Sequence, residues 1–322
     1  MRWKYSANAG FFGLRRDRFN TYQPDRPLDE KFALVSQVDG LTGIELKYPG
    51  DLDDLQKARE LLERYHLELS AVNVNTKSVE HFRHGSWSAR SVDARKKTVQ
   101  LLKEGMDIAA EMGVNLVSTC PAIDGYDYPF QMDYSEAWQN FIDNLKSVTS
   151  HRDDVTLMLE YQPRDPNAKI LLNNVGKTLF VCNEVGASNL GANLDIGHSL
   201  AASEAPAESA VLLNRKGLLK YIHSNDNTGD GGDWDMISGT VHFWHWIELI
   251  YTLMEMGYDG WIGADLAPRH FGPGAAFSTN IMMIERMSKL IEKAGMEQIQ
   301  SLLKQDGNTP KIYEKLTEIF SI

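Results

Sequence analysis

The sequence predicts one α/β domain with a (β/α)8 (TIM) barrel, followed by a short helical extension. Three observations support this prediction. Short apolar segments alternate with amphipathic helical segments eight times, which is typical of a parallel sheet. The length of 322 residues suits a single large barrel. No Gly-x-Gly-x-x-Gly sequence follows the first strand, so the fingerprint of a dinucleotide-binding open sheet is missing.

The predicted barrel strands are short apolar runs that end at a polar or turn-forming residue. The first four lie at residues 3–7, 43–48, 69–75 and 115–120. The last four are apolar runs that end at Glu160, Asp195, His223 and Asp265. Pro49 and Pro121 follow the second and fourth strands, and a proline marks a strand end because it cannot donate to the ladder.

The predicted helices fill the intervals between these strands and follow the last one. They cover residues 29–38, 51–66, 92–112, 134–150, 174–186, 207–215, 241–256 and 277–294. Asp54 and its acidic neighbours provide N-caps for the second helix, and Gly113 follows the third helix as its C-terminal glycine. Residues 1–294 are therefore assigned to the barrel.

Residues 295–322 are assigned to the helical extension. Five apolar residues at helical spacing share one face of it: Ile312, Tyr313, Leu316, Ile319 and Phe320. This face packs either on the chain's own barrel or on a partner subunit, and both alternatives stay open at this point.

The composition excludes several classes of protein. The formal charge is -11, which argues against non-specific binding to nucleic acid or to an anionic membrane surface. Two cysteines, Cys120 and Cys182, do not make a disulfide framework. The N-terminus lacks the apolar run of a signal peptide, and no stretch reaches the roughly 20 apolar residues of a membrane span. We expect a soluble cytoplasmic protein.

A cluster of metal ligands is predicted at the mouth of the barrel. Glu160, Asp195, His223 and Asp265 stand at the ends of strands five to eight. In a (β/α)8 barrel the C-terminal strand ends meet at one mouth, where active sites form. Three carboxylates packed together would repel one another, and a divalent cation such as Mn²⁺, Mg²⁺ or Co²⁺ removes that repulsion. The sequence therefore predicts one divalent metal site.

A second acidic set follows close behind in the sequence. His198 stands three residues after Asp195, and Asp233 and Asp235 flank Trp234 in the loop after the seventh strand. Together with Asp195 these residues have the composition of a second cation site, which gives one or two ions per chain. The alternative is a solvated acidic loop.

The motifs resemble those of the xylose-isomerase-like barrels, and they are most similar to the branch that holds L-rhamnose isomerase and related sugar isomerases and epimerases. The similar segments are residues 82–86, 160–166, 194–198, 223–227, 233–236, 239–242 and 260–265. The resemblance implies a divalent-metal sugar site in a barrel that forms a dimer or tetramer. It implies that the first ion is bound by Glu160, Asp195, His223 and Asp265, and that Asp195, His198, Asp233 and Asp235 flank a second.

One position departs from the family's pattern. Members that move a hydride from aldose to ketose usually carry a lysine two residues after the first glutamate, where this chain has Gln162. A neutral amide donates a hydrogen bond but cannot transfer a proton. In the branch resembling D-tagatose 3-epimerase, two carboxylates instead pass a proton through an enediolate. Glu160 and Asp265 are the candidate catalytic bases for that route.

Substrate contacts are predicted for five polar and aromatic residues near the mouth: Gln162, His84, Asn225, Trp87 and Trp234. No phosphate-binding glycine-rich loop stands out, which favours an unphosphorylated sugar. The leading hypothesis is a metal-dependent sugar isomerase or epimerase.

Three alternatives stay open. One is a lyase of the same fold that cleaves oxidised (3-keto) C-glycosides together with a small partner subunit. The others are a DNA-repair endonuclease, which the net charge of -11 disfavours, and a sugar-binding protein without turnover.

Overall fold

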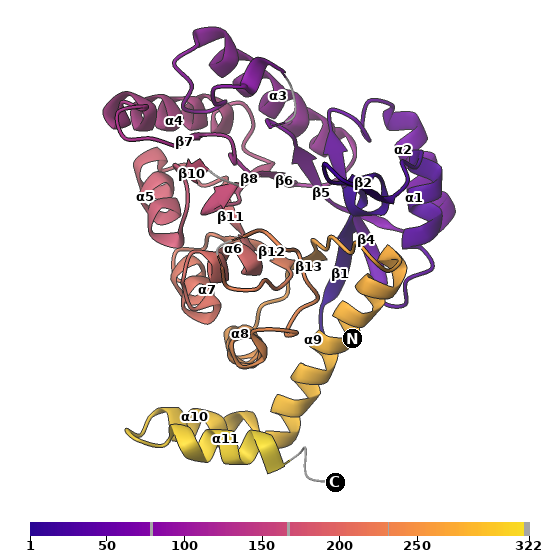
Figure 1. Cartoon of the computed structure of the whole chain (residues 1–322), viewed down its shortest axis with the longest axis vertical. Helices are drawn as coiled ribbons and strands as arrows, with labels where there is room; N and C mark the ends of the chain where they lie inside the picture. Colours follow the sequence, from indigo (N-terminus) through magenta and orange to yellow (C-terminus); the bar gives the residue numbers. More distant parts are fainter. Residues whose placement is uncertain (78–79, 166–167, 231, 319–322) are drawn as a thin grey trace.

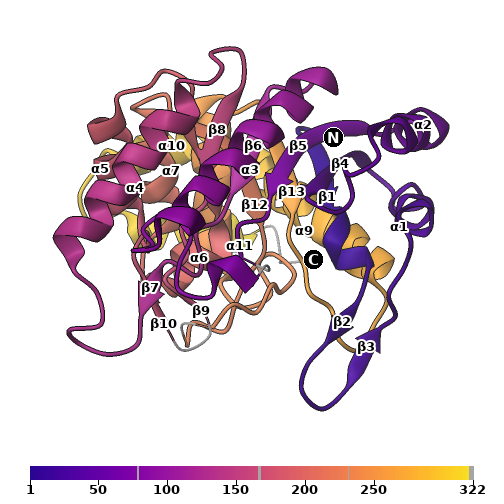
Figure 2. The same ribbon diagram turned by 90° about the horizontal axis from the view of Figure 1, so that it is seen from above.

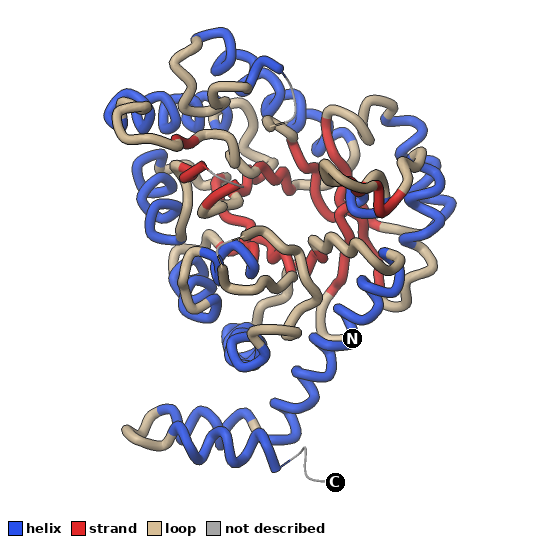
Figure 3. Tube along the Cα trace, viewed as in Figure 1, coloured by secondary structure: helices blue, strands red, loops and turns tan. Residues whose placement is uncertain are grey.

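Eight short parallel strands close into a barrel, and helices surround it (Figures 1 and 3). Their order around the barrel is β1-β13-β12-β11-β8-β6-β5-β4. The strands span Lys4–Asn8 (β1), Leu41–Tyr48 (β4), Glu68–Val74 (β5), Leu116–Thr119 (β6), Thr156–Leu159 (β8), Leu190–Asp195 (β11), Leu219–Ser224 (β12) and Trp261–Ala264 (β13). Each strand is parallel to both neighbours, which confirms the predicted (β/α)8 fold.

The computed structural model describes residues 1–77, 80–165, 168–230 and 232–318. Three residues of the sequence predictions lie outside the described residues: Pro166, Ile319 and Phe320. Within the described ranges, no helix combines the length and the apolar character needed to cross a membrane.

Side chains fill the interior of the barrel below the strand ends. Tyr221 points inward from β12, and its hydroxyl is hydrogen-bonded to Ser6 and, at 2.9 Å, to Ser70. Met158 packs beside it. Gly263 makes room for the tyrosine ring, because a Cβ at that position would lie 2.6 Å from ring atom Cε1. The lower barrel is therefore filled by packed side chains, and its few polar groups are hydrogen-bonded to one another.

The outer helices lie in the predicted intervals, with shifted ends. They span Leu28–Val35 (α1), Leu55–Tyr65 (α2), Val92–Glu111 (α3), Tyr134–Thr149 (α4), Val175–Val185 (α5), Pro206–Asn214 (α7), Phe243–Met256 (α8) and Pro273–Ala294 (α9). The helix α2 begins after Asp54, whose side chain accepts a hydrogen bond from the backbone N–H of Lys57. The helix α9 begins earlier than predicted because Pro273 suits the first helical turn.

Short strands form within the loops at the mouth. The pair β2 (Arg15–Arg16) and β3 (Thr21–Gln23) forms a hairpin after β1, in a segment predicted as a loop. A three-stranded sheet joins β7 (Gly125–Tyr126), β10 (Ala168–Ile170) and β9 (Arg164–Asp165). Figure 2 shows these strands on the same side of the barrel. They follow β1, β6 and β8, so they rim the mouth where those strands end.

The C-terminal helices form an arm that projects from the barrel below α8 and α9 (Figure 1). The arm contains α10 (Met296–Leu303) and α11 (Thr309–Glu318). Leu316 is buried, and the ring of Tyr313 lies 4.9 Å from that of Trp244 in α8. The described part of the predicted apolar face therefore contacts the chain's own helices, and Tyr313 also stays partly exposed.

Candidate metal centre

Four side chains meet at the C-terminal ends of neighbouring barrel strands. Glu160 directly follows β8, and Asp195 is the last residue of β11. His223 in β12 is paired in register with Asp195, and Asp265 directly follows β13. One ligand atom of each residue lies within 4.8 Å of the others. The structure thus brings together the four residues that the sequence analysis singled out as first-metal ligands.

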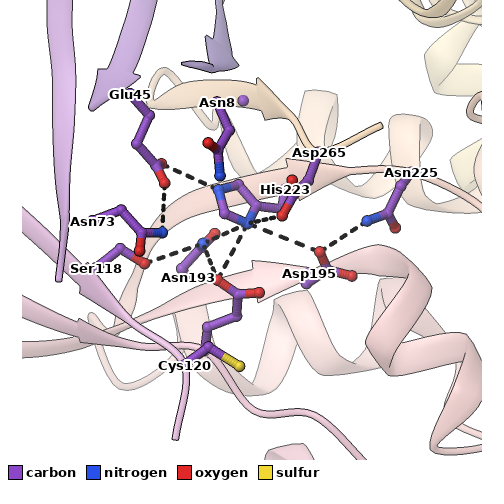
Figure 4. Close-up of polar contacts among 12 residues, drawn as sticks. Asn8, Glu45, Asn73, Ser118, Cys120, Asn193, Asp195, His223, Asn225 and Asp265 are labelled. Carbon is purple, nitrogen blue, oxygen red and sulfur yellow. Dashed lines mark hydrogen bonds and ion pairs between the residues drawn. The ribbon is translucent and has the colours of Figure 1, made fainter. Parts of the chain in front are cut away.

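The imidazole ring of His223 is contacted on both edges (Figure 4). Its Nε2 lies 3.2 Å from Oε2 of Glu45, which reaches across from β4. Its Nδ1 lies 3.2 Å from a carboxylate oxygen of Glu160 and 3.4 Å from one of Asp265. The nitrogen that faces the cluster is therefore Nδ1.

The carboxylate of Asp195 is held by the chain around it. Oδ1 accepts a hydrogen bond of 2.8 Å from the backbone N–H of His198 and so caps the short helix α6 (Ile196–Ala201), which the sequence analysis did not predict. Oδ2 accepts one of 2.9 Å from the amide of Asn225, and the oxygen of that amide accepts one from the N–H of Gly197. A Cβ at residue 197 would lie 2.4 Å from this oxygen, so the contact requires glycine.

This geometry corrects the prediction that Asn225 contacts the substrate. Its side chain is fully buried, and its amide is already engaged with Asp195 and Gly197. Asn225 orients the carboxylate of Asp195 (Figure 4).

Burial and neighbouring charges shift the pKa values of the cluster in opposite directions. Burial alone raises the pKa of Glu160, but the imidazoles of His223 and His198 outweigh burial and bring this pKa to about 2. Burial lowers the pKa of His223, but Glu160 and Glu45 raise it well above its usual value. Burial raises the pKa of Asp265 well above its usual value; His223 opposes that shift and Glu160 adds to it. Without a bound cation, protons kept on His223 and Asp265 offset the negative charge of the cluster.

The donor set fits a divalent cation. Carboxylate oxygens and an imidazole nitrogen suit Mn²⁺, Mg²⁺ or Co²⁺. Oδ1 of Asp265 is buried and has no hydrogen-bond partner among the described residues, so it is available as a ligand. His223 offers Nδ1, because its Nε2 faces Glu45. The arrangement suits one ion and leaves the identity of the metal open.

The second acidic set lies beside the first cluster in a different arrangement. Nδ1 of His198 lies 3.5 Å from Glu160, and its Nε2 lies 3.4 Å from Asp233. Asp235 instead lies 3.4 Å from the guanidinium of Arg15. Burial and the charge of Asp233 raise the pKa of Asp235 well above its usual value. In the part of the chain that the structure describes, these residues do not form a compact ligand group of their own, and the second ion stays a prediction.

Gln162 is buried between the two sets. Its Nε2 donates a 2.9 Å hydrogen bond to Asp233, and its Oε1 lies 3.5 Å from the thiol of Cys120. Burial raises the pKa of Asp233, but His198 and, more weakly, the ammonium of Lys77 bring it to about 2. Lys77, which follows β5, is therefore a cation of this site that the sequence analysis did not single out.

The other predicted substrate contacts lie in three different places. Trp87 is fully buried with its ring 5.6 Å from that of Phe141, which corrects the prediction that it lies at the mouth: it packs in the core. Trp234 is 43% exposed, and its indole N–H donates to Asp230. His84 lines a groove of about 830 Å³ between the loops after β5 and β6, and no residue of the four-membered cluster lines that groove.

The sequence analysis missed two buried polar residues that touch the cluster. Glu45 interrupts the apolar run of β4 and contacts His223. The amide nitrogen of Asn193 lies 3.1 Å from Glu160 and 3.0 Å from Nδ1 of His223. A charged or amide side chain inside an apolar strand was the available signal, but it does not reveal which distant strand provides its partner.

Comparisons with known proteins agree with this architecture. Residues 32–299 match the family described as xylose isomerase-like TIM barrel. A relative from Mesorhizobium japonicum, named "Probable sugar isomerase", is 23% identical over 273 residues, which cover 81% of this chain and 62% of that protein. The chain thus spans less than two thirds of the length of this relative.

Two crystal structures show the same fold. A D-tagatose 3-epimerase-like protein superposes with a TM-score of 0.68 and 21% identity, covering 89% of this chain and 98% of that one. The 3-keto-D-glucoside 4-epimerase of E. coli has a TM-score of 0.67 and 14% identity, covering 88% and 99%. With a family match that covers most of its length, the chain belongs to the xylose isomerase-like TIM barrel family.

Proposed function

We propose that the protein is a divalent-metal-dependent epimerase or isomerase of an unphosphorylated monosaccharide. The observation that carries the proposal is the cluster of Glu160, Asp195, His223 and Asp265, whose ligand atoms lie within 4.8 Å of one another at the mouth of the barrel. The names of the similar proteins, a sugar isomerase and two sugar epimerases, support the same class of reaction.

Glu160 and Asp265 are the groups proposed to move the proton. They follow β8 and β13, and the strands β11 and β12 separate them in the barrel. A carboxylate removes a proton from the carbon next to a carbonyl, and a second carboxylate on another side of the sugar returns one. A Mn²⁺, Mg²⁺ or Co²⁺ ion held by the cluster polarises the sugar oxygens when bound.

Gln162 supports proton transfer over hydride shift. Its amide donates to Asp233 and carries no proton that it can release to a sugar oxygen. The absence of a lysine at this position therefore places the acid–base work on carboxylates.

Arg15 supports an unphosphorylated substrate. This arginine of the mouth hairpin reaches the site, where its guanidinium lies 3.4 Å from Asp235. A phosphate would have to compete with that carboxylate.

A second candidate is a lyase that acts on oxidised 3-keto glycosides with a partner subunit. The name of one similar protein, a 3-keto-D-glucoside 4-epimerase, supports it, because that name describes an oxidised glycoside as substrate. In that reaction one carboxylate would remove the proton next to the 3-keto group, the bond from C1 to the aglycone would break, and the second carboxyl group would return a proton to the departing aglycone carbon.

The experiment is a substrate panel in D₂O with Mn²⁺-loaded protein. The panel contains ketoses, aldoses and 3-keto glycosides, and Asp195→Ala serves as the control without a complete cluster. Turnover with one solvent deuterium in the product supports the proposal. Turnover with retention of the substrate hydrogen would indicate hydride shift, and turnover by Asp195→Ala or after exhaustive chelation would contradict the proposed metal dependence.

A further inference from the structure

Glu45 is a fully buried carboxylate on the wall of the barrel opposite the four-membered cluster. It stands in the middle of β4, and its side chain is 1% exposed. One oxygen accepts a 2.8 Å hydrogen bond from the amide of Asn73 in β5. The other oxygen lies 3.2 Å from Nε2 of His223. No arginine or lysine pairs with Glu45 in the part of the chain described.

The interaction of Glu45 with its partner explains why a carboxylate is buried at this position. Burying a carboxylate costs free energy, and an apolar side chain would fill the same space in β4 without that cost. The partner here is the imidazole whose opposite nitrogen faces Glu160 and Asp265. Figure 4 shows the ring of His223 lying between Glu45 on one side and the cluster on the other.

The contact determines which ring nitrogen carries the hydrogen. A carboxylate accepts hydrogen bonds, so Nε2 must be the donor toward Glu45. In the neutral ring, Nδ1 then keeps its lone pair and directs it at the cluster, where the amide nitrogen of Asn193 lies 3.0 Å away and also favours an unprotonated Nδ1. Asn73 fixes the glutamate from behind, so the carboxylate stays within reach of Nε2.

We propose that Glu45 is a positioning residue, which fixes His223 as the Nε2–H tautomer and so prepares Nδ1 to bind the divalent ion. Glu45 is not one of the four proposed ligands. Asn73 in β5 holds Glu45 in β4, and Glu45 in turn holds His223 in β12. The inference rests on the proposed function in one respect, the binding of a divalent ion at the cluster. Loss of a carboxylate that orients a ligating histidine typically weakens metal binding about 10- to 100-fold.

The test compares Mn²⁺ affinity by calorimetry on metal-free protein. Glu45→Gln removes the charge and keeps the shape, and Glu45→Asp keeps the charge but withdraws it from Nε2. Both variants are expected to bind Mn²⁺ about 10- to 100-fold more weakly. The matched control is Asp124→Asn, because Asp124 is also a fully buried carboxylate but accepts its hydrogen bonds from Ser86 and Ser88, outside the cluster. Its affinity is expected to equal that of the wild type.

A spectroscopic measurement separates positioning from general destabilisation. Nitrogen-15 spectra of histidine-labelled, metal-free protein at alkaline pH, where the imidazole is neutral, report the tautomer, and the spectrum of His223→Asn assigns the His223 signals. The wild type is expected to show a protonated Nε2, and Glu45→Gln a mixture of both tautomers. If one Glu45 variant does not fold, the other carries the test.

The outcomes separate the role of Glu45 from the proposed function. Wild-type affinity and an unchanged tautomer in both Glu45 variants would overturn the role of Glu45 and leave the proposed function intact. Equal weakening by Asp124→Asn would also overturn it, because any buried carboxylate would then serve. A wild-type protein that binds no Mn²⁺ would overturn the proposed function and this inference together.

Discussion

The two acidic sets at the mouth differ in what supports them. Glu160, Asp195, His223 and Asp265 stand in or directly after four neighbouring barrel strands. Asp233 and Asp235 stand in the loop between β12 and α8. A strand end in a closed barrel has little freedom, whereas a loop takes its shape from local contacts. The first set is therefore preorganised by the fold itself, and the second set depends on its loop.

The loop that holds Asp233 and Asp235 relies on an unusual backbone conformation and on local hydrogen bonds. Asp235 adopts a left-handed backbone with φ of 47°, a conformation that non-glycine residues rarely adopt. Asp226 fastens the loop by accepting hydrogen bonds from the backbone N–H groups of Val241 and His242. The imidazole of His242 lies 2.7 Å from the same carboxylate. Similar residues thus serve different purposes in our proposal: the strand ends would provide the ligands, and the loop would provide charge and shape around them.

Replacing one aspartate by asparagine in each set is expected to give the largest difference in activity. Asp195→Asn removes a carboxylate from the first set and is expected to lower kcat/KM by roughly a thousandfold or more, because metal ions contribute several kcal/mol to such reactions. Asp235→Asn makes the same change in the second set and is expected to cost about tenfold or less, since Asp235 lies outside the compact ligand group. Steady-state kinetics with saturating Mn²⁺ measures both; equal losses would contradict the distinction.

The pH dependence of metal stabilisation is the next effect. In the metal-free protein the pKa of His223 lies well above its ordinary value of 6.5, because its carboxylate neighbours outweigh burial. Its contribution to stability is thus fully present below pH 6.5 and is lost as pH rises through the raised pKa. A cation bound at the cluster would replace this proton. The increase in melting temperature on adding Mn²⁺ is therefore expected to grow between pH 6 and pH 8.5, by about a few degrees.

The control for this prediction is His223→Asn, in which the dependence on pH should flatten. A melting-temperature increase that is constant from acidic to alkaline pH in the wild type would contradict the expected competition between proton and metal at His223.

A further effect, much smaller than that of Asp195→Asn, concerns Gln162, which lies between the two sets. Gln162→Leu removes the hydrogen bond to Asp233, and a bond to a charged group contributes about 1.5–3 kcal/mol. We expect kcat/KM to fall by about tenfold, with Mn²⁺ affinity at the first set unchanged. Kinetics and calorimetry on one preparation check both parts. A loss as large as that of Asp195→Asn would mean that Gln162 touches the reacting atoms.

The sequence predicts the strand-borne part of this molecule better than the part borne by loops. Eight alternating segments and four ligand-type residues at strand ends are local patterns, and the rule that parallel strand ends share one mouth converts them into a cluster. The positions of Asn225 and Trp87 were not accessible in this way. Whether a buried side chain faces the mouth or packs in the core depends on contacts between segments far apart in the chain, such as the one between Trp87 and Phe141.

The same reason explains the absence of Glu45 from the sequence prediction. Its partner His223 is 178 residues away in the chain, and only closure of the barrel brings β4 opposite β12. In α11, at the end of the arm, the local pattern is readable but its partner surface is not. Helical spacing predicts the shared face of Ile312, Tyr313 and Leu316, but spacing does not tell which surface covers it.

Anomalous diffraction from crystals of the metal-free protein soaked in Mn²⁺ tests the proposed metal site at the strand ends. We predict one strong anomalous peak at bonding distance from Glu160, Asp195, Nδ1 of His223 and Asp265. A peak held only by His198, Asp233 and Asp235, or no peak at the strand ends at saturating Mn²⁺, would contradict the account.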